Sequence, residues 1–478
     1  MTDRSDLHRP ASSSPRPEPH PADRLDSPQP IHRVIDMVDP DTQQFFRGDA
    51  DRAREILLAA ARGADPGELA ELDGSFALVA RDGEKVVLAR SLDRPLRYFL
   101  AKVEAGPLLV VAERMDEIRD CLEAEGLHGQ FHPTYTRMVP AHHTVTLRLV
   151  GCPDPNPVYT RFFTPARADG PADVAALGER YVGALHDELG RWLDHLAEGG
   201  QGGAPLGVAF SGGIDSGAVL LCLYRALLDR GESPSRLKAF TLAVGEGGAD
   251  AAQAREFLQR VDLEMLGEEI TVAPEEVDPF AAVELIEDYK PLDVECAAMG
   301  RALLAGVRRR YPEWRHVVDG DGGDENLKDY PIEENPELTI RSVVNNSMLY
   351  QEGWGVHAIK HSLTYSGGLS RSCVRTWAPA RELGFAPFSP FTRPAVVAAA
   401  ESIPFAELTG GSHDKLYALK GELVAAGVAA VTGLEMPIFP KRRFQHGAGP
   451  ASWFEERFGV EPARYRQHLL DHHGVGDR

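Results

Sequence analysis

Apolar residues follow two different patterns along the chain, and the change between them lies near residue 150. Before it, short apolar runs at close intervals predict strands at 74–80, 85–90, 98–102, 108–112 and 144–150, with one helix at 53–61. Because no long helix separates these strands, we expect a mainly antiparallel sheet.

From residue 171 onward, strands and helices alternate. A helix is predicted at 173–196, followed by an apolar strand that contains Val208, a buried helix at 218–228, strands at 238–244 and 268–272, and helices at 249–261 and 300–310. This alternation predicts a parallel, doubly wound sheet, which binds ligands beyond the carboxyl ends of its strands. The region beyond about residue 340 is expected to be mostly helical.

These patterns divide the chain into five segments. Residues 1–30 hold seven prolines among polar residues, which predicts a disordered tail. We expect the antiparallel sheet domain at 31–150, a proline-punctuated linker at 151–170, the parallel-sheet domain at 171–460 and a C-terminal tail at 461–478. The length of 478 residues also favours two domains.

Composition and charge exclude several function classes. The formal net charge of −21 argues against a nucleic-acid groove or an anionic membrane surface as the main partner. Five cysteines lie far apart without a Cys-x-x-Cys pair, which argues against a cysteine-based zinc site or a disulfide framework: Cys121, Cys152, Cys222, Cys296 and Cys373. With no apolar run long enough to span a bilayer, we expect a cytoplasmic protein.

The first candidate site is the turn from Ser211 to Ser216, which follows the strand containing Val208. Gly212 and Gly213 let the backbone approach an anion, and the next helix begins with unpaired N–H groups. Hydroxyl donors flank the turn, and Asp215 would need a divalent cation beside bound phosphates. We therefore predict a phosphate and metal site. The alternative is a tight turn without a ligand.

The second candidate site is the acidic turn from Asp319 to Glu325, again after a buried strand. Gly320, Asp321 and Asp324 lie within it. Carboxylates so close together repel unless a cation shares the site, so Asp324 and Asp215 are predicted to hold Mg2+ between them. A solvent-facing acidic loop is the alternative.

A third stretch, from Met436 to Gly447, combines stiff prolines with cations that include Lys441. In an acidic protein such a cluster suits a developing oxyanion or phosphoryl group, although basic loops are often simply solvated.

Taken in order, these motifs resemble known enzymes. The turn Ser-Gly-Gly-Ile-Asp-Ser at 211–216 is similar to the pyrophosphate loop of N-type ATP pyrophosphatases. Residues 320–325, 389–392 and 440–447 resemble three later motifs of asparagine synthetases. Leu72 to Ala77, Ala89-Arg90 and Arg94 to Tyr98 are similar to their glutaminase domain. The resemblance, which extends to beta-lactam synthetases, covers roughly residues 70 to 450.

The resemblance implies a fold and a set of roles. The fold would join an α+β glutaminase-like, Ntn-type antiparallel domain to an α/β ATP pyrophosphatase domain of the adenine nucleotide alpha hydrolase type, with a helical C-terminal part. ATP would bind at Val208, Ser211, Gly212, Gly213, Asp215, Ser216, Leu242 and Gly320, and Mg2+ at Asp215 and Asp324. Lys441 would stabilise charge during adenylation and amide formation. Asp321 stands where asparagine synthetases have glutamate and beta-lactam synthetases have tyrosine, and could deprotonate an amine.

Departures from the family's motifs limit the reactions that the resemblance implies. Family glutaminases begin Met-Cys-Gly, whereas this chain begins Met1-Thr2-Asp3, and its Asn-Gly-Glu segment is missing. Without the nucleophilic cysteine we expect no release of ammonia from glutamine, and therefore a degenerate N-terminal domain. Thr392 stands where the family has aspartate.

The resulting hypothesis is an ATP-dependent ligase that activates a carboxylate as an acyl-adenylate, releases pyrophosphate and transfers the acyl group to an amine from a source other than glutamine. Alternatives are an intramolecular lactam synthetase, an ammonia-dependent asparagine synthetase and a non-catalytic ATP-binding protein. The partners would be small-molecule carboxylic acids and amines, and related enzymes tend to be dimers, so a homodimer is compatible. The acceptor pocket is expected at 333–382, where Arg371 or Arg375 could hold an anionic group. The identity of the two substrates stays open.

Overall fold

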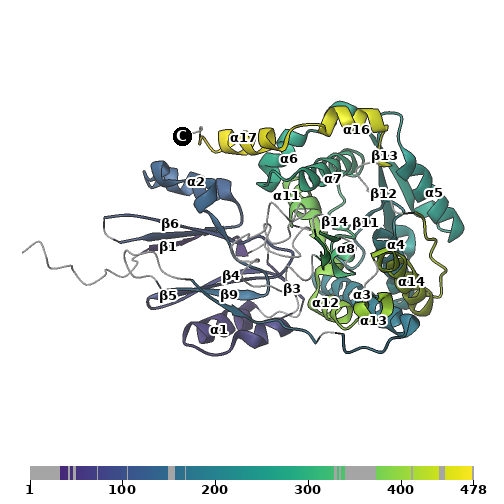
Figure 1. The fold of residues 1–478 in the computed structure, drawn as a ribbon, viewed down its shortest axis with the longest axis horizontal. Coiled ribbons are helices and arrows are strands. Elements are labelled where there is room, and N and C mark those ends of the chain that lie inside the picture. Colours follow the sequence, from purple (N-terminus) through teal and green to yellow (C-terminus); the bar gives the residue numbers. More distant parts are fainter. Residues whose placement is uncertain are drawn as a thin grey trace, which may run out of the picture.

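The computed structural model describes residues 33–475, with gaps at 41–42, 47–49, 73, 105, 149–156, 167, 328–330, 333–334, 340–372, 411–412 and 441–446. Two parts follow each other along the chain, one built on a mixed and an antiparallel sheet and one on a parallel sheet (Figure 1). The predicted disordered tail at 1–30 and most of the predicted acceptor stretch at 333–382 lie outside the described residues.

The N-terminal part contains two four-stranded sheets. The first has the order β1-β7-β6-β8, with bounds Arg33–Asp36, Leu108–Ala112, Arg97–Ala101 and Arg137–Met138. The second has the order β10-β9-β5-β4, with bounds Val158–Arg161, His143–Arg148, Lys85–Arg90 and Ala77–Asp82. The second sheet is antiparallel, as expected. In the first, β1 pairs parallel with β7, because the strands between them in sequence provide a long crossover.

The core of this part lies between the two sheets. Val86 and Leu88 of β5 pack with Tyr98 of β6 and Val111 of β7, all buried. Helix α1 (Ala50–Ala61) covers the second sheet and helix α2 (Met115–Ala124) the first. The result is four layers, helix, sheet, sheet and helix (Figure 1).

Two details differ from the sequence expectation. The predicted strand at 74–80 is interrupted at Phe76: β3 (Gly74–Ser75) pairs with β2 (Gln44–Phe45), and β4 starts afterwards. Gly74 permits this pairing, because a Cβ there would lie 2.2 Å from the Gln44 carbonyl oxygen. Strand β10 lies inside the predicted linker 151–170 and extends the sheet by pairing with β9.

The second part is organised around a parallel five-stranded sheet of order β13-β12-β11-β14-β17. Their bounds are Gly267–Val272, Leu237–Val244, Leu206–Ala209, His316–Val318 and Ala386–Phe388. Strands β12 and β13 extend the sheet on one side of β11, and β14 and β17 extend it on the other. The strand order therefore reverses between β11 and β14, which is where doubly wound sheets bind ligands.

Helices cover both faces of this sheet (Figure 1). One apolar core joins it to α3 (Val174–Glu198), α4 (Ile214–Asp229), α5 (Ala249–Arg260), α12 (Pro394–Glu401), α13 (Phe405–Thr409) and α14 (His413–Thr432). The other joins it to α6 (Pro279–Ile286), α7 (Pro291–Arg310), α11 (Ala378–Glu382), α16 (Ala451–Phe458) and α17 (Pro462–His472). Helix α7 begins earlier than the predicted 300–310, and α17 lies in the predicted tail, where Tyr465 and Leu469 are buried.

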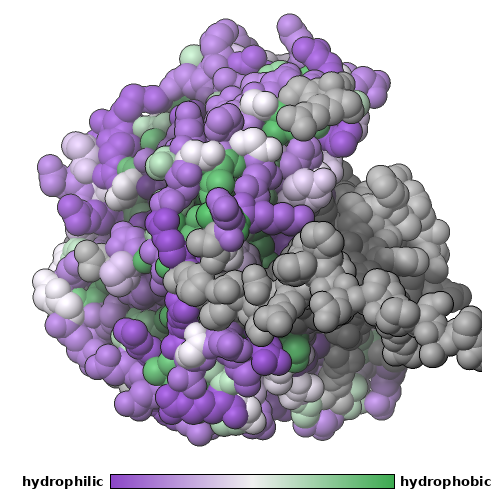
Figure 2. All heavy atoms as spheres, turned by 90° about the vertical axis from the view of Figure 1, so that its left-hand side faces the viewer, coloured by the Kyte–Doolittle hydropathy of each residue, from purple (hydrophilic) through white to green (hydrophobic). Residues whose placement is uncertain are grey.

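Short elements complete the described chain. They are η3 (Pro66–Glu71), η4 (His128–Gln130), η5 (Pro133–Tyr135), η6 (Pro234–Arg236), η7 (Glu264–Leu266), η8 (Pro274–Glu276), α8 (Gly323–Asn326), β15 (Pro331–Ile332), β16 (Asn335–Thr339), the π-helix η9 (Cys373–Trp377) and η10 (Pro390–Thr392). Among the described helices, none is both long and apolar enough to cross a membrane. Hydrophilic side chains cover most of the coloured surface in Figure 2.

Candidate active site

The two glycine-rich turns predicted from the sequence meet at the point where the strand order reverses. Strands β11 and β14 are neighbours, and each runs directly into one of the turns. A Cβ on Gly323 would lie 2.4 Å from Asp215 Oδ1, and one on Gly320 would lie 3.0 Å from the Ser216 nitrogen. Both glycines are therefore needed for the acidic turn to lie against the phosphate turn.

The phosphate turn is held by its own hydroxyls. Ser216 Oγ accepts a hydrogen bond of 3.3 Å from the Ser211 nitrogen, and Ser211 Oγ accepts one of 3.3 Å from the Gly213 nitrogen. Gly212 has a φ of +72°, in the left-handed region that favours glycine. Helix α4 begins at Ile214, so its unpaired N–H groups and partial positive charge face the turn. This arrangement suits an anion.

Asp215 and Asp324, the two predicted metal ligands, share a lysine that the sequence analysis missed. Lys420 Nζ donates to Asp215 Oδ2 at 2.8 Å and also contacts Asp324 Oδ1. The Lys420 side chain is only 4% exposed, whereas the two carboxylates are about one-fifth exposed. A signal for Lys420 did exist, because it lies on the apolar stripe of α14 with Leu416, Leu423 and Val424.

Burial and like charge shift the protonation of this site. Loss of solvent raises the pKa of Asp215 to about 7; Lys420 opposes the rise and Asp324 adds to it. Loss of solvent, followed by the nearby Asp321, also raises the pKa of Asp319 well above its usual value. A site that resists carrying several negative charges is one that gains from a bound cation.

Asp319 and Asp321 have different roles in the acidic turn. Asp319 is buried, accepting 2.9 Å from Ser389 Oγ and 3.0 Å from the Asp321 nitrogen, so it shapes the turn. Asp321 lines the cavity described below. The hydroxyl of Thr392 donates to the Ser389 carbonyl at 2.7 Å, which gives this family departure a structural role in holding the segment that bonds Asp319.

A cavity of about 220 Å³ opens beside the two turns. Ser211, Gly213, Asp215, Ser216, Gly320, Asp321, Asp324 and Lys420 line its polar side. Leu292, Cys296, Leu303 and Leu304 of α7 form an apolar wall. The cavity thus joins an anion-binding end to an apolar surface, a combination suited to a nucleotide or an activated acyl group.

The remaining predicted residues are placed as follows. Val208 and Leu242 are buried in β11 and β12 and do not line the cavity, whereas Ala209 does. Arg375 lines it with its Nε 3.4 Å from Asp293 and its Nη1 3.7 Å from Glu325, so two carboxylates already balance its charge. Arg371 and Lys441 lie outside the described residues, although Pro440, which precedes Lys441 in sequence, lines the cavity.

Part of the chain is similar to a known protein family. Residues 198–370 match the family model described as asparagine synthase. The match contains both glycine-rich turns, and it covers less than half of the chain. It supports an ATP-dependent synthetase that forms amide bonds, because members of that family are ATP-dependent carbon–nitrogen ligases. A comparison with curated proteins found no match. The glutaminase-like origin of the N-terminal part stays a prediction.

Proposed function

We propose that this protein is an amide synthetase that uses ATP to activate a small-molecule carboxylic acid as an acyl-adenylate and then joins it to an amine from a source other than glutamine. The observation that carries the proposal is the convergence of Asp215, Asp324 and Lys420 on the turn from Ser211 to Ser216, beside a cavity with an apolar wall. Hydrogen-bond donors for phosphate, metal-binding carboxylates and a buried cationic side chain are the groups that release of pyrophosphate requires.

The residues present fit Mg2+. Asp215 and Asp324 offer the oxygen ligands that Mg2+ prefers, and Asp215 Oδ1 is buried without a hydrogen-bond partner among the described residues. When bound with ATP, Mg2+ would screen the phosphate charges and favour departure of pyrophosphate. The raised pKa of Asp215 supports the same assignment, since a cation would favour its charged form.

The chain's own groups would carry the other tasks. The N–H groups and hydroxyls of the phosphate turn would bind the pyrophosphate end of ATP, and Lys420 would add a positive charge as negative charge builds up there. Asp321 would accept a proton from the incoming amine. Lys441, next to Pro440, would stabilise the tetrahedral intermediate. The apolar wall on α7 would keep water away from the activated acyl group.

An amine source other than glutamine agrees with the chemistry of Cys121, the first cysteine of the chain. Burial raises the pKa of the Cys121 thiol, and nearby Glu125 raises it further, which disfavours the nucleophilic thiolate. We propose that the N-terminal part is a degenerate glutaminase-like domain, retained for its contacts with the synthetase part rather than for hydrolysis.

The test is carboxylate-dependent exchange of labelled pyrophosphate into ATP, screened with and without amines. We expect one class of carboxylate to start exchange, and an added amine to yield an amide and AMP. Asp324→Asn should abolish exchange, whereas Asp187→Asn, at an aspartate with a 70% exposed side chain on α3, should not. Both variants should keep the wild-type circular dichroism spectrum.

Product mass separates the rival reactions. If the product has the mass of one substrate minus one water molecule, the reaction is intramolecular lactam formation and not ligation of two substrates. Asparagine formed from aspartate and ammonium would identify an asparagine synthetase. Failure of the folded protein to bind ATP with Mg2+ in calorimetry would overturn the proposal.

A further inference from the structure

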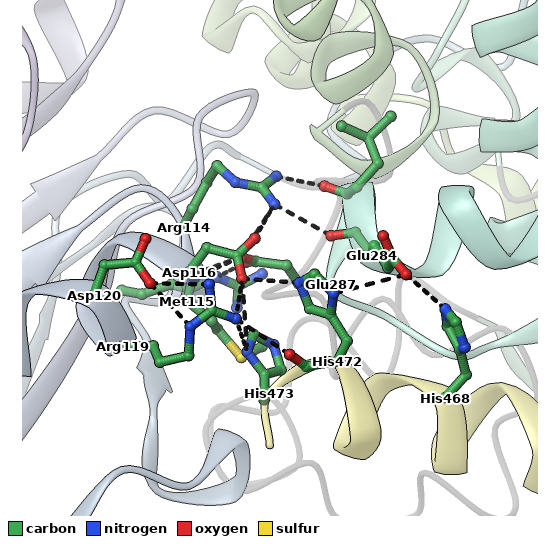
Figure 3. A network of polar contacts seen from close by, with 12 residues as sticks. Arg114, Met115, Asp116, Arg119, Asp120, Glu284, Glu287, His468, His472 and His473 are labelled. Atoms are coloured by element: carbon green, nitrogen blue, oxygen red, sulfur yellow. Dashed lines mark hydrogen bonds and ion pairs between the residues drawn. The ribbon is translucent and has the colours of Figure 1, made fainter. Parts of the chain in front are cut away.

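A second polar cluster joins three helices that contribute nothing to the phosphate turn. Figure 3 shows His472 and His473, at the end of α17, directed toward Asp116 on α2. His472 Nε2 lies 3.0 Å from Asp116 Oδ1, and His473 Nδ1 lies 3.7 Å from the same oxygen. One ligand atom from each residue can be chosen so that all three lie within 4.8 Å of one another. We propose that Asp116, His472 and His473 bind a divalent transition-metal ion of the zinc type, bridging the two parts of the chain.

The spacing is close to that of a tetrahedral site. Ligand bonds of roughly 2.0–2.1 Å place neighbouring ligand atoms about 3.3 Å apart around zinc. The two measured separations from Asp116 Oδ1 lie on either side of that value. Two imidazoles and one carboxylate are a donor set that favours zinc over magnesium or calcium, and they leave a fourth position for water.

A second carboxylate lies near His472. Its Nδ1 lies 3.7 Å from Glu284 Oε1 on α6, on the ring edge opposite the nitrogen that faces Asp116. Glu284 is in turn bonded by His468 Nε2 at 2.8 Å. Metal-binding histidines commonly donate their other N–H to a carboxylate, which directs the free lone pair at the ion. Glu284 is therefore assigned as a positioning residue.

His473 is fixed at the proposed site by packing. Its side chain is fully buried, and its ring packs 5.5 Å from Phe131, centroid to centroid. A buried ring that is already fixed loses little conformational freedom when its Nδ1 binds an ion.

Arg119 would compete with the ion for Asp116 and His473. Its Nη1 lies 3.0 Å from Asp116 Oδ1 and 3.5 Å from His473 Nδ1, near the position that the ion would take. Arg119 also donates to the His472 carbonyl at 3.3 Å and pairs with Asp120 at 2.9 Å; at 26% exposure its guanidinium can turn outward and keep Asp120 as a partner. Arg114 binds the other oxygen of Asp116, at 2.7 Å, and can stay. In the metal-free protein, Arg119 thus takes the place of the cation.

The test uses the full chain, stripped with EDTA and titrated with Zn2+ in calorimetry. We expect one equivalent of zinc that is lost in His472→Ala. Glu284→Gln should weaken binding by about tenfold, the size expected for a residue that orients a ligand. Arg119→Gln should tighten it, because the competitor is removed. His128→Ala, at an exposed histidine of η4, is the matched control and should bind like the wild type.

Asp324→Asn distinguishes zinc bound at the nucleotide site. The proposal would be overturned if zinc binding were lost in Asp324→Asn but kept in His472→Ala. It would also be overturned if the wild-type protein bound no zinc. Co2+ provides an independent signature, because a tetrahedral site with histidine ligands gives visible absorption that His472→Ala should abolish. His472 is the decisive position because it is partly exposed, and circular dichroism checks the fold of each variant.

Discussion

Lys420 Nζ lies 2.8 Å from Asp215 Oδ2, although the two residues, on α14 and α4, are far apart in the sequence. The same ammonium contacts Asp324. In the free protein Lys420 balances two carboxylates that would otherwise repel each other. If the site binds a cation and a triphosphate as proposed, the carboxylates gain another partner and Lys420 can interact with phosphate.

Replacing Lys420 by methionine should therefore lower activity. The side chain keeps its length and apolar contacts but loses its charge. We expect pyrophosphate exchange to fall on the order of 100-fold, the size seen when one preorganised electrostatic donor is removed. Lys415→Met, at an exposed lysine of the same helix, should retain exchange. Equal activity of the two variants would remove Lys420 from the proposed machinery.

Stability should depend on pH through Asp215. Its folded-state pKa, raised to about 7, exceeds the unfolded value, so the folded protein holds a proton that the unfolded chain releases. The contribution to stability is present below about pH 4 and is lost as pH rises toward 7. The denaturation midpoint of the Mg2+-free, ATP-free protein should fall over this window, and Asp215→Asn should flatten the slope. The buried Asp319 acts in the same direction, so some slope should remain.

Much of the candidate site was predictable because its parts lie at strand ends. Both glycine-rich turns follow buried strands, and a parallel sheet brings such ends to one edge, so their meeting follows from local pattern. Lys420 lies within a long helix and has no turn around it. Its only signal is a charge on an apolar stripe, which local pattern does not connect with Asp215. Long-range contacts of this kind depend on packing.

The same limit applies to the fold. Strand lengths in the N-terminal part follow from alternation and β-propensity, but the parallel pairing of β1 with β7 joins segments far apart in sequence. Likewise α17 has few apolar residues, and it is fixed by Tyr465 packing on Phe280 of α6, with ring centroids 5.5 Å apart. A short polar helix at the end of a chain resembles a tail until its partner is known.

Gly323 should tolerate no side chain, because a Cβ there would meet Asp215 Oδ1. Gly323→Ala must displace the Asp215 carboxylate from its position beside the acidic turn. A displacement of this size next to reacting groups costs about 100-fold in rate, so exchange should fall by that factor while the protein stays folded. Gly183→Ala on α3, where nothing lies within 4 Å of the added carbon, is the control and should be slightly stabilising. Full exchange activity in Gly323→Ala would contradict the close contact of the turns.

Glu287 makes buried polar contacts between the two parts of the chain. Its carboxylate accepts 2.6 Å from the Met115 nitrogen, capping α2, and lies 3.0 Å from Arg97. The residue is buried, with a φ of +52° that is unusual for a non-glycine. Glu287 directly follows α6, and Figure 3 shows it next to Met115 and Asp116 of α2. A buried acceptor in this position stabilises the N-terminus of α2 and compensates a buried arginine.

We expect Glu287→Ala to lower the free energy of unfolding by about 3 kcal/mol, because Arg97 would keep a buried charge without this partner. Glu287→Gln should lower it by less, since the amide oxygen can still accept from Met115, although the neutral side chain no longer balances the charge of Arg97. Urea denaturation followed by circular dichroism measures both, with Asp120→Asn, at an exposed position on α2, as the control. If Glu287→Ala matched the control, the Glu287 carboxylate would have no role in joining the two parts.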